Sequence, residues 1–588
     1  MPLKKRLQAA REAVEDRLGL GASLRAIGER SIPRRTGAGT ALSGAILILL
    51  LVEALTGLAL ASTYVPTTTD AWGSVFYIQE QMTLGGLVRG IHYHGATLLV
   101  VLALLHLIQM VFTASYRSPH EVGWFVGCFL LLLIFGFGVT GYVLPWDQAG
   151  YWANQTELNV MDTAPGGGWI RLLLAGGPET GNQTLTRFYA LHVFVLPLLT
   201  LGLLWLRGRA VAVKGYPGGA GEVEAGTSRP YWPYQALWTS LVAIFAMAAI
   251  LLLALTVGVG LEAPADPGSV YEARPKWYLL FLYKLLQYFD GPAAIVATVV
   301  FPLVAVGMLM AVPFLDKGGS GPRPPKRVWA PLALLLFAVA GLSFVSLQAD
   351  ADNPAFQEAR MEAAREANQA IRMARVGGIN ADGRVVLYEG QKLYQSKGCK
   401  SCHVAGAEEK PAPLLAGYGT RGRIKRFLRN PNHPDFFGRT VFNDMMDPFI
   451  EGYDGSEDEL DAVATWLYSL SGRSVDETEQ VAAGYAFFRS NCLDCHNDPG
   501  LSFDHRACLG TDCDTSTYRP GVEGPDLRAY QGYEWTRGVI VDATHPSFFG
   551  GVLDESTVEK TMPAYPDMSP TDLDLLTTWL VAGAPGAN

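Results

Sequence analysis

Apolar residues are concentrated in the first 347 residues of the chain, where they form seven long stretches separated by shorter, more polar loops. Each stretch is long enough for an α-helix to cross the hydrocarbon core of a membrane, which takes about 20 residues. The expected fold is therefore all-α, with a seven-span transmembrane bundle followed by small soluble helical domains. The predicted spans are residues 40–61, 91–114, 122–144, 188–206, 234–259, 292–315 and 328–347.

The distribution of lysine and arginine predicts the orientation of these helices. Basic residues flank alternate ends of the spans, whereas the loop 62–88 on the opposite side has none. Because basic loops stay in the cytoplasm, we expect a cytoplasmic N-terminus and a C-terminal part on the outer side. The segment 1–37 is expected to form an amphipathic helix on the cytoplasmic surface. A signal peptide fits less well, because the first apolar run begins only near Ala41 and is long enough to remain an anchor.

The chain after residue 347 contains an internal repeat. A charged linker, 348–386, has a helix expected over 356–375 and leads into two segments, 387–472 and 479–588. Each segment has a helix leading into CxxCH, an HPxFFG sequence, a methionine and a closing helix. The repeat predicts two small domains of the same fold.

Both repeats carry the CxxCH sequence, which accounts for four of the seven cysteines. The two thiols of such a motif add to the vinyl groups of a haem, and the adjacent histidine ligates the iron. A single CxxCH could belong to a zinc site, but two, each preceded by a short helix, favour two covalently bound haems c. The residues are Cys399, Cys402 and His403 in the first repeat, and Cys492, Cys495 and His496 in the second.

The second axial ligand of each haem c is expected to be a methionine that precedes the closing helix. Met562 has this position in the second repeat, and in the first repeat we prefer Met446 to its neighbour Met445. The histidines of the two HPxFFG sequences, His433 and His545, are expected to have a structural role in a turn.

The three remaining cysteines have other expected roles. Cys508 and Cys513 belong to the second repeat, outside the membrane, where an oxidising compartment favours a disulfide between them. Cys128 lies within the third span and is expected to pack against neighbouring helices.

Histidines within the spans indicate a second kind of haem site. His92 and His106 are fourteen residues apart, which places both on one face of the second span. A histidine in a bilayer helix is costly unless it has an internal partner, and the fourth span offers His192. Facing histidines from two helices predict a haem b with two histidine ligands. Fifteen residues beyond His192, where a second pair would include His106, the chain has Arg207.

Other residues in the spans leave alternatives open. Glu53 is either a hydrogen-bonded structural carboxylate or a group that handles protons. His94 points about 200° away from His92 around the helix, so we expect it to be an interface residue and not a ligand. Glycines recur in the first three spans and suit either close helix approach or room for a flat macrocycle.

With these residues in place, the membrane part resembles cytochrome b of the cytochrome bc complexes, in its seven-span form. The resemblance covers residues 40–347 and includes the histidine-bearing second span and the sequences GVTGYVLPWDQAGYWA, TLTRFYALHVFVLPLL and ARPKWYLLFLYKLLQYF. It implies a four-helix haem-binding domain, 38–210, and a three-helix domain, 211–347. The tail is similar to a fused di-haem cytochrome c.

The resemblance also implies the ligands of the b haems. In that family two b haems span the bilayer, and here His92 and His192 would bind the outer one. The inner haem would need His106 and a histidine near position 207, where Arg207 stands. Since arginine stays protonated, it is a poor iron ligand. The inner haem is therefore absent, held by His106 alone or ligated in an unusual way, which gives one haem b or two.

A quinol-oxidation site is implied as well. The Pro-Glu-Trp-Tyr motif of the family corresponds here to Pro275, Lys276, Trp277 and Tyr278. A protonated lysine does not accept a proton from quinol, as the glutamate of the family is thought to do. Glu272 lies one helical turn earlier and is expected either to pair with Lys276 or to replace it in part.

The expected function is that of a subunit in a bc-like complex of a bacterial inner membrane. Electrons would pass from quinol, through a separate Rieske iron–sulfur protein or haem b, to two periplasmic c haems and a soluble acceptor. The alternatives are an electron-transfer module without a Q cycle, and an assembly or anchoring subunit. The resemblance implies a homodimer, and a net charge of −9 gives no reason to expect nucleic acid.

Overall fold

The computed structural model describes residues 25–33, 38–215, 228–316, 324–405, 412–500 and 524–587, apart from short gaps. The gaps are residues 27, 178, 290, 381–383, 448, 450–452, 454, 551–552, 554–556 and 558–560. The chain divides into two compact units, residues 1–368 and 369–588, each of which is described by itself.

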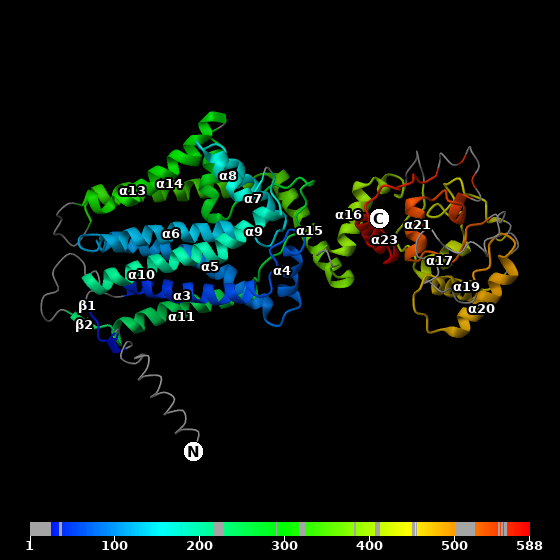
Figure 1. Ribbon diagram of the computed structural model, residues 1–588, viewed down its shortest axis with the longest axis horizontal. Coiled ribbons are helices and arrows are strands. Elements are labelled where there is room, and N and C mark those ends of the chain that lie inside the picture. Colours follow the sequence, from blue (N-terminus) through cyan, green and yellow to red (C-terminus); the bar gives the residue numbers. More distant parts are fainter. Residues whose placement is uncertain are drawn as a thin grey trace, which may run out of the picture. The chain divides into compact units, whose positions relative to one another are not determined.

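The first unit contains seven helices that are long and apolar enough to cross a membrane, at the positions of the seven predicted spans (Figure 1). The first three are α3 (Ala38–Ala61), α5 (Gly85–Phe112) and α6 (Glu121–Gly141). The fourth comprises α9 (Asn182–Ala190), the π-helical turn η1 (Leu191–Val195) and α10 (Leu196–Lys214). The last three are α11 (Tyr234–Thr256), α13 (Phe301–Leu315), which follows the π-helical turn η4 (Val296–Val300), and α14 (Lys326–Ala351).

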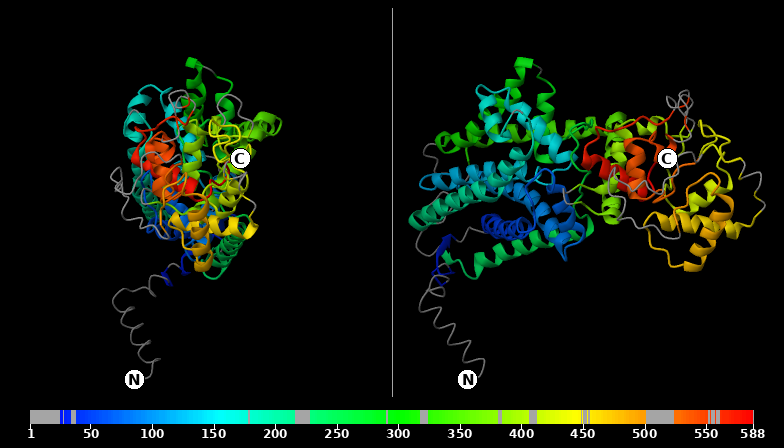
Figure 2. Two further views of the ribbon diagram at one scale, coloured as in Figure 1. Left: turned by 90° about the vertical axis from the view of Figure 1, so that its right-hand side faces the viewer. Right: turned by 45° about the vertical axis from the view of Figure 1, so that its right-hand side comes forward.

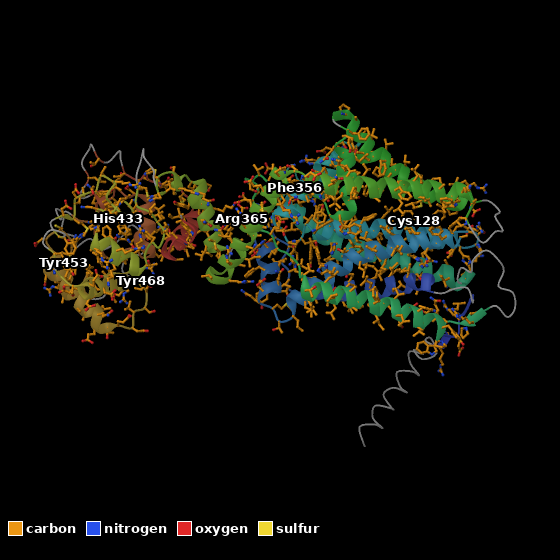
Figure 3. All side chains as sticks on the ribbon, turned by 180° about the vertical axis from the view of Figure 1, so that it is seen from behind. Cys128, Phe356, Arg365, His433, Tyr453 and Tyr468 are labelled. Atoms are coloured by element: carbon orange, nitrogen blue, oxygen red, sulfur yellow. The ribbon has the colours of Figure 1, made fainter. Side chains whose placement is uncertain are left out.

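The core of the bundle lies mainly between α3, α5, α6 and α11, which run side by side (Figures 1 and 2). Leu99, Trp124 and Ile250 are buried there together with Cys128, which lies within the bundle in Figure 3. This confirms that Cys128 packs against neighbouring helices. Gly90 faces Ala254 so closely that an added Cβ would lie 2.8 Å from the alanine Cβ, so this glycine serves helix approach.

Shorter elements cover one end of the bundle. They are α4 (Ala71–Glu80), α7 (Gln148–Met161), α8 (Gly167–Ala175), η2 (Trp277–Leu279) and α12 (Leu280–Leu286). Helix α7 begins where the side chain of Asp147 accepts a hydrogen bond from the Gly150 amide at 2.9 Å. The second Asp147 oxygen accepts from the Glu262 amide at 3.2 Å, which fixes the loop that leads to η2 against α7.

A two-stranded antiparallel pair is the exception to the all-α expectation. Strands β1 (Ser31–Pro33) and β2 (Ser228–Pro230) pair with Ser31 opposite Pro230. They join the segment before α3 to the segment before α11. The helix expected in the linker is also present, as α15 (Pro354–Gly377).

Among its described residues, the second unit contains six longer helices. They are α16 (Val386–Ser396), α17 (Arg421–Arg429), α19 (Glu457–Leu470), α20 (Thr478–Asn491), α21 (Tyr533–Val541) and α23 (Pro570–Val581). Helix α16 packs against α23, and α19 packs against α20, as Figures 1 and 2 show. The helices that precede the two CxxCH motifs therefore each pack against the closing helix of the other repeat.

Candidate functional site

Two histidines face each other within the bundle, as the sequence predicts. His92 on α5 and His192 in η1 have ring centroids 6.3 Å apart, with an angle of 73° between the ring planes. The Nδ1 atom of His92 lies 3.0 Å from a Glu53 carboxylate oxygen and 3.1 Å from the Thr56 hydroxyl. The Nδ1 atom of His192 lies 2.9 Å from the Thr140 hydroxyl. Each ring is thus oriented through Nδ1, and its Nε2 remains for a ligand.

This geometry fits one iron between two imidazoles. A metal–nitrogen bond is about 2 Å long, so two such bonds and the half-widths of the rings account for the separation of the centroids. Ligating histidines are normally held through their other nitrogen, which is the arrangement of His92 and His192. At Gly141 an added Cβ would lie 2.7 Å from Cε1 of His192, so this glycine gives the ring its place. Glu53 holds a candidate ligand, which supports the structural alternative for this carboxylate.

The position one membrane leaflet away differs. His106 on α5 is hydrogen-bonded through Nδ1 to Gln109 at 3.1 Å and lies within electrostatic reach of Arg207. The Arg207 guanidinium donates to the Gly123 carbonyl at 3.2 Å. Arg207 therefore lies near the place where a second imidazole would be needed. His94 contacts the Gly258 carbonyl at 2.8 Å and is an interface residue, as predicted.

The segment Pro275–Tyr278 contacts α5 through Lys276 and α6 through Tyr278. Lys276 donates to the Tyr93 hydroxyl at 3.4 Å and lies over the rings of Tyr93 and Tyr142, at 5.2 and 5.9 Å from their centroids. Tyr278 stacks on Phe135 with centroids 5.8 Å apart. Aromatic rings thus surround the lysine ammonium group.

Of the two alternatives left open for Glu272, pairing with Lys276 or replacing it in part, the structure contradicts the pairing. The Glu272 carboxylate pairs with Arg274 at 3.5 Å, and its side chain is 49% exposed. Arg274 also pairs with Asp350 at 3.0 Å and lies over the Phe356 ring, which is labelled in Figure 3. The arginine is nearer to Glu272 along the chain, and its planar fork holds both carboxylates while Lys276 turns to the tyrosines.

A carboxyl group that the sequence analysis missed lies close to this segment. Glu157 on α7 accepts a hydrogen bond from the Tyr142 hydroxyl and is within electrostatic reach of Tyr278. Burial raises the pKa of Glu157 to about 8. Its other oxygen, Oε2, is buried with no hydrogen-bond partner among the described residues. The signal in the sequence was an acidic residue shortly after GVTGYVLPWDQAGYWA, one of the sequences that carry the resemblance. Its contact with Tyr142 is visible only in the tertiary structure.

The two CxxCH motifs have matching surroundings in the second unit. The Nδ1 atom of His403 is hydrogen-bonded to the Pro413 carbonyl at 2.7 Å, and that of His496 to the Pro525 carbonyl at 3.0 Å. Burial lowers the pKa of both imidazoles, which keeps them neutral, as iron ligation requires. The cysteines Cys399, Cys402, Cys492 and Cys495 are free thiols. Both sites therefore fit a covalently attached haem.

The remaining predicted residues have simpler outcomes. Met445 is 46% exposed and Met446 is half-buried, and the preference for Met446 as a ligand stays a prediction. Cys508 and Cys513 lie outside the described residues. The Nδ1 atoms of His433 and His545 accept hydrogen bonds from the amides two residues later, both at 3.2 Å. These contacts give the two histidines, of which Figure 3 labels His433, the expected place in a turn.

Comparisons with known proteins agree with this geometry. Residues 30–210 match the family model of cytochrome b/b6/petB, and residues 387–471 match the family model of cytochrome c. Cytochrome b6 of Chlamydomonas reinhardtii is 38% identical over 205 residues, which are 35% of this chain and 95% of the relative. The menaquinol:cytochrome c reductase cytochrome b subunit of Geobacillus thermodenitrificans is 36% identical over 200 residues, which are 32% of this chain and 89% of the relative.

Two further matches are longer. The cytochrome bc complex cytochrome b subunit of Chlorobaculum thiosulfatiphilum is 35% identical over 281 residues, which are 47% of this chain and 65% of the relative. The matched region is thus slightly less than two thirds of that relative. A chain of the solved structure titled "Hyperthermophilic respiratory Complex III" shares the fold, with a TM-score of 0.50 and 21% identity over 62% of this chain and 97% of that chain.

A helical membrane bundle with facing histidines, followed by a c-type haem motif, defines a haem-binding membrane protein. The chain belongs to the cytochrome b/b6 family, and it carries a fused cytochrome c domain at residues 387–471. The family implies haem b, and the cytochrome c domain implies covalently bound haem c.

Proposed function

We propose that this chain is the cytochrome b subunit of a quinol-oxidising, bc-type complex and carries its own c-type electron acceptors. The observation that carries the proposal is the His92–His192 pair, oriented through Nδ1 on both sides. The name of the Geobacillus relative, menaquinol:cytochrome c reductase cytochrome b subunit, supports quinol as the electron donor. The two matching CxxCH surroundings support two c haems, the second of them in residues 479–588.

The finer assignments belong to the same proposal. Quinol would be oxidised beside Pro275–Tyr278, on the outer side of a bacterial inner membrane, with a cytoplasmic N-terminus. A Rieske iron–sulfur protein on a separate chain would take one electron, and a soluble periplasmic carrier would accept electrons from the c haems. The complex would be a homodimer, in line with the resemblance to cytochrome bc complexes.

A second candidate function has an observation of its own. Arg207 lies near His106 where a second imidazole would be needed, so we propose a single haem b per chain. Without an inner haem the chain would not carry electrons across the membrane, which a Q cycle requires. The chain would then act as a non-bifurcating module that joins the quinone pool to c-type carriers.

The haem b to haem c ratio of the purified chain separates these two functions. We expect a pyridine haemochrome spectrum to give a ratio near one to two, because among the described residues only His92 and His192 form a facing pair of histidines. That result would exclude a Q cycle through this protein. A ratio near two to two would contradict the single-haem proposal and return the chain to the bifurcating class. Loss of haem b altogether would overturn the His92–His192 site.

A further inference from the structure

We propose that the two c haems are ligated across the sequence repeats, so that His403 is paired with Met562 and His496 is paired with Met446. The inference rests only on the c-type haem attachment within the proposed function. It replaces the simpler pairing of each histidine with the methionine of its own repeat.

The helix before the first CxxCH packs against the last helix of the chain. The Tyr394 and Trp579 rings, from α16 and α23, have centroids 5.0 Å apart. An added Cβ at Gly390 would lie 2.3 Å from the Trp579 Cβ, so the glycine permits this close helix contact. At the end of α16, Lys397 lies 3.9 Å from Asp572, the carboxylate in the first turn of α23.

The segment that carries Met562 lies beside the first pair of haem-binding cysteines. Tyr565, three residues after Met562, donates its hydroxyl to the Lys397 carbonyl at 3.4 Å. The same hydroxyl is within electrostatic reach of Cys399 and Cys402. The second repeat thus brings its methionine loop to the haem motif of the first.

The reciprocal arrangement holds for the second haem motif. The Trp466 and Phe488 rings, from α19 and α20, have centroids 4.6 Å apart. Phe449, three residues after Met446, contacts Phe487 of α20 with centroids 6.4 Å apart. Phe449 and Cys492 also belong to the same hydrophobic core. The loop with Met446 therefore lies beside the helix that leads into Cys492.

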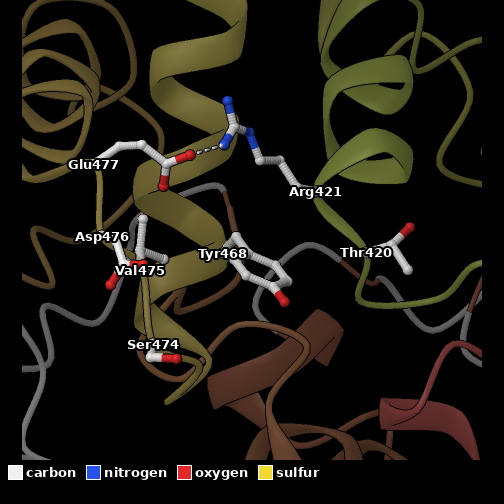
Figure 4. Close-up of a pocket in the computed structure, with 7 residues that line it drawn as sticks. All are labelled: Thr420, Arg421, Tyr468, Ser474, Val475, Asp476 and Glu477. Carbon is white, nitrogen blue, oxygen red and sulfur yellow. Dashed lines mark hydrogen bonds and ion pairs between the residues drawn. The ribbon is translucent and has the colours of Figure 1, made fainter.

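Charged contacts fasten the same group of helices. Arg421 at the start of α17 pairs with Asp461 of α19. It also pairs with Glu477, the residue before α20, at 3.2 Å (Figure 4). Figure 4 shows this ion pair at one side of a pocket that Tyr468 of α19 also lines. Helices α17, α19 and α20, together with the second CxxCH, thus form one body.

The physical reason is the length of the connections. Only residues 471–477 join α19 to α20, and helices with so short a connection pack as neighbours. Residues 420–530 then form one cytochrome c body, inserted between two pieces that form the other. Close to the place where the chain enters the inserted body, the Gly417 amide donates a hydrogen bond to the Gly583 carbonyl at 2.9 Å.

Paired substitutions in the full chain test the ligand assignment. In oxidised c-type haems, methionine sulfur bound to iron gives a charge-transfer band in the red, and its amplitude counts the methionine-ligated haems. H403A removes this band from the first haem, whether that haem changes its ligands or is not attached. If the repeats are crossed, H403A/M562L keeps the same half of the wild-type band as H403A alone, and the matched control H403A/M446L loses all of it. The reverse outcome would overturn the proposal.

A cross-link in the unaltered chain gives a second measurement. A carbodiimide joins a lysine to a carboxylate at zero length, and we expect it to join Lys397 to Asp572. A link from Lys397 to Glu459, which has the corresponding position in the first turn of α19, would overturn the proposal. Neither readout needs quinol turnover, so a chain with two c haems and no quinol activity would refute the proposed function and leave the crossed pairing standing.

We infer independently that Glu157 accepts a proton from quinol, a step that rests on the proposed quinol site. Oxidation of a quinol to a quinone releases two protons and two electrons. Glu157 would accept one hydroxyl proton, the second proton would pass to water, and the electron acceptors of the proposed complex would take the two electrons. Glu157 is buried beside Tyr142 and Tyr278, and Lys276 lies over the Tyr142 ring. A carboxylate with a buried, unpartnered oxygen can accept a proton that the Lys276 ammonium cannot.

Glu157→Gln in the intact complex tests this step. We expect kcat for quinol oxidation to fall about 100-fold, the scale of a lost general base, with KM little changed. Because the pKa of Glu157 is raised to about 8, wild-type turnover should rise with pH up to that value, and the variant should be flat. Glu157→Asp should restore part of the rate, and Glu121→Gln on α6 is the control. Unchanged kcat with an intact haem spectrum would overturn this role, and a wild-type complex without quinol activity would instead refute the proposed function.

Discussion

The purified His192→Leu variant is expected to contain no haem b while both c haems remain attached. Leucine has no nitrogen that can bind iron. His92 would then face an apolar side chain instead of the imidazole whose ring centroid lies 6.3 Å from its own. The haem b to haem c ratio in a pyridine haemochrome spectrum should fall from about one to two to zero. The rate of quinol oxidation should fall to the background rate of a protein that lacks haem b.

The matched control for His192→Leu is His94→Gln. His94 is also a histidine of the bundle, but its ring contacts the Gly258 carbonyl and not the other imidazoles, and glutamine keeps a donor for that carbonyl. This variant should retain haem b at the wild-type ratio. Haem b present in His192→Leu, or absent only from His94→Gln, would show that the facing pair is not the iron site.

The transmembrane part of the fold could be predicted because membrane physics leaves a strong signal. A span needs about 20 apolar residues, so each helix is visible without knowledge of its neighbours. The His92–His192 pair was predictable for a related reason, since buried imidazoles in a bilayer need partners and the chain offers few of them. The residues that orient these rings, Thr56 and Thr140, carry no such signal because threonine is common in membrane helices.

Sequence alone did not determine contacts that depend on a choice among similar partners. Glu272 was expected to pair with Lys276 or to replace it in part, but the guanidinium of Arg274, which is nearer along the chain, forms the ion pair. The two repeats have the same order of elements, so the sequence does not say whether α16 packs against α19 or against α23. The short connection between α19 and α20 is the feature that selects the crossed arrangement. The place of Glu157 in the candidate site could not be predicted, because it depends on a tertiary contact between α7 and the end of α6.

The register of the fourth span places Arg207 on the helix face that carries His192. His92 and His106 are fourteen residues apart on a regular α-helix, whereas His192 and Arg207 are fifteen apart on a helix that contains the π-helical turn η1. A π-turn holds an additional residue, so position 207 returns to the face that His192 occupies. The electrostatic contact between Arg207 and His106 agrees with this register.

Arg207→His should therefore create a second site for haem b. The new imidazole would face His106 one membrane leaflet from the first pair, and the haem b to haem c ratio should rise from about one to two to about two to two. Arg209→His is the matched control, because position 209 points about 200° away around α10 and should leave the ratio unchanged. If Arg207→His binds no additional haem, the end of the bundle near His106 lacks room for the macrocycle, in addition to lacking a second histidine in the wild-type chain. The binding of a single haem b would then be a consequence of the helix packing and not of Arg207 alone.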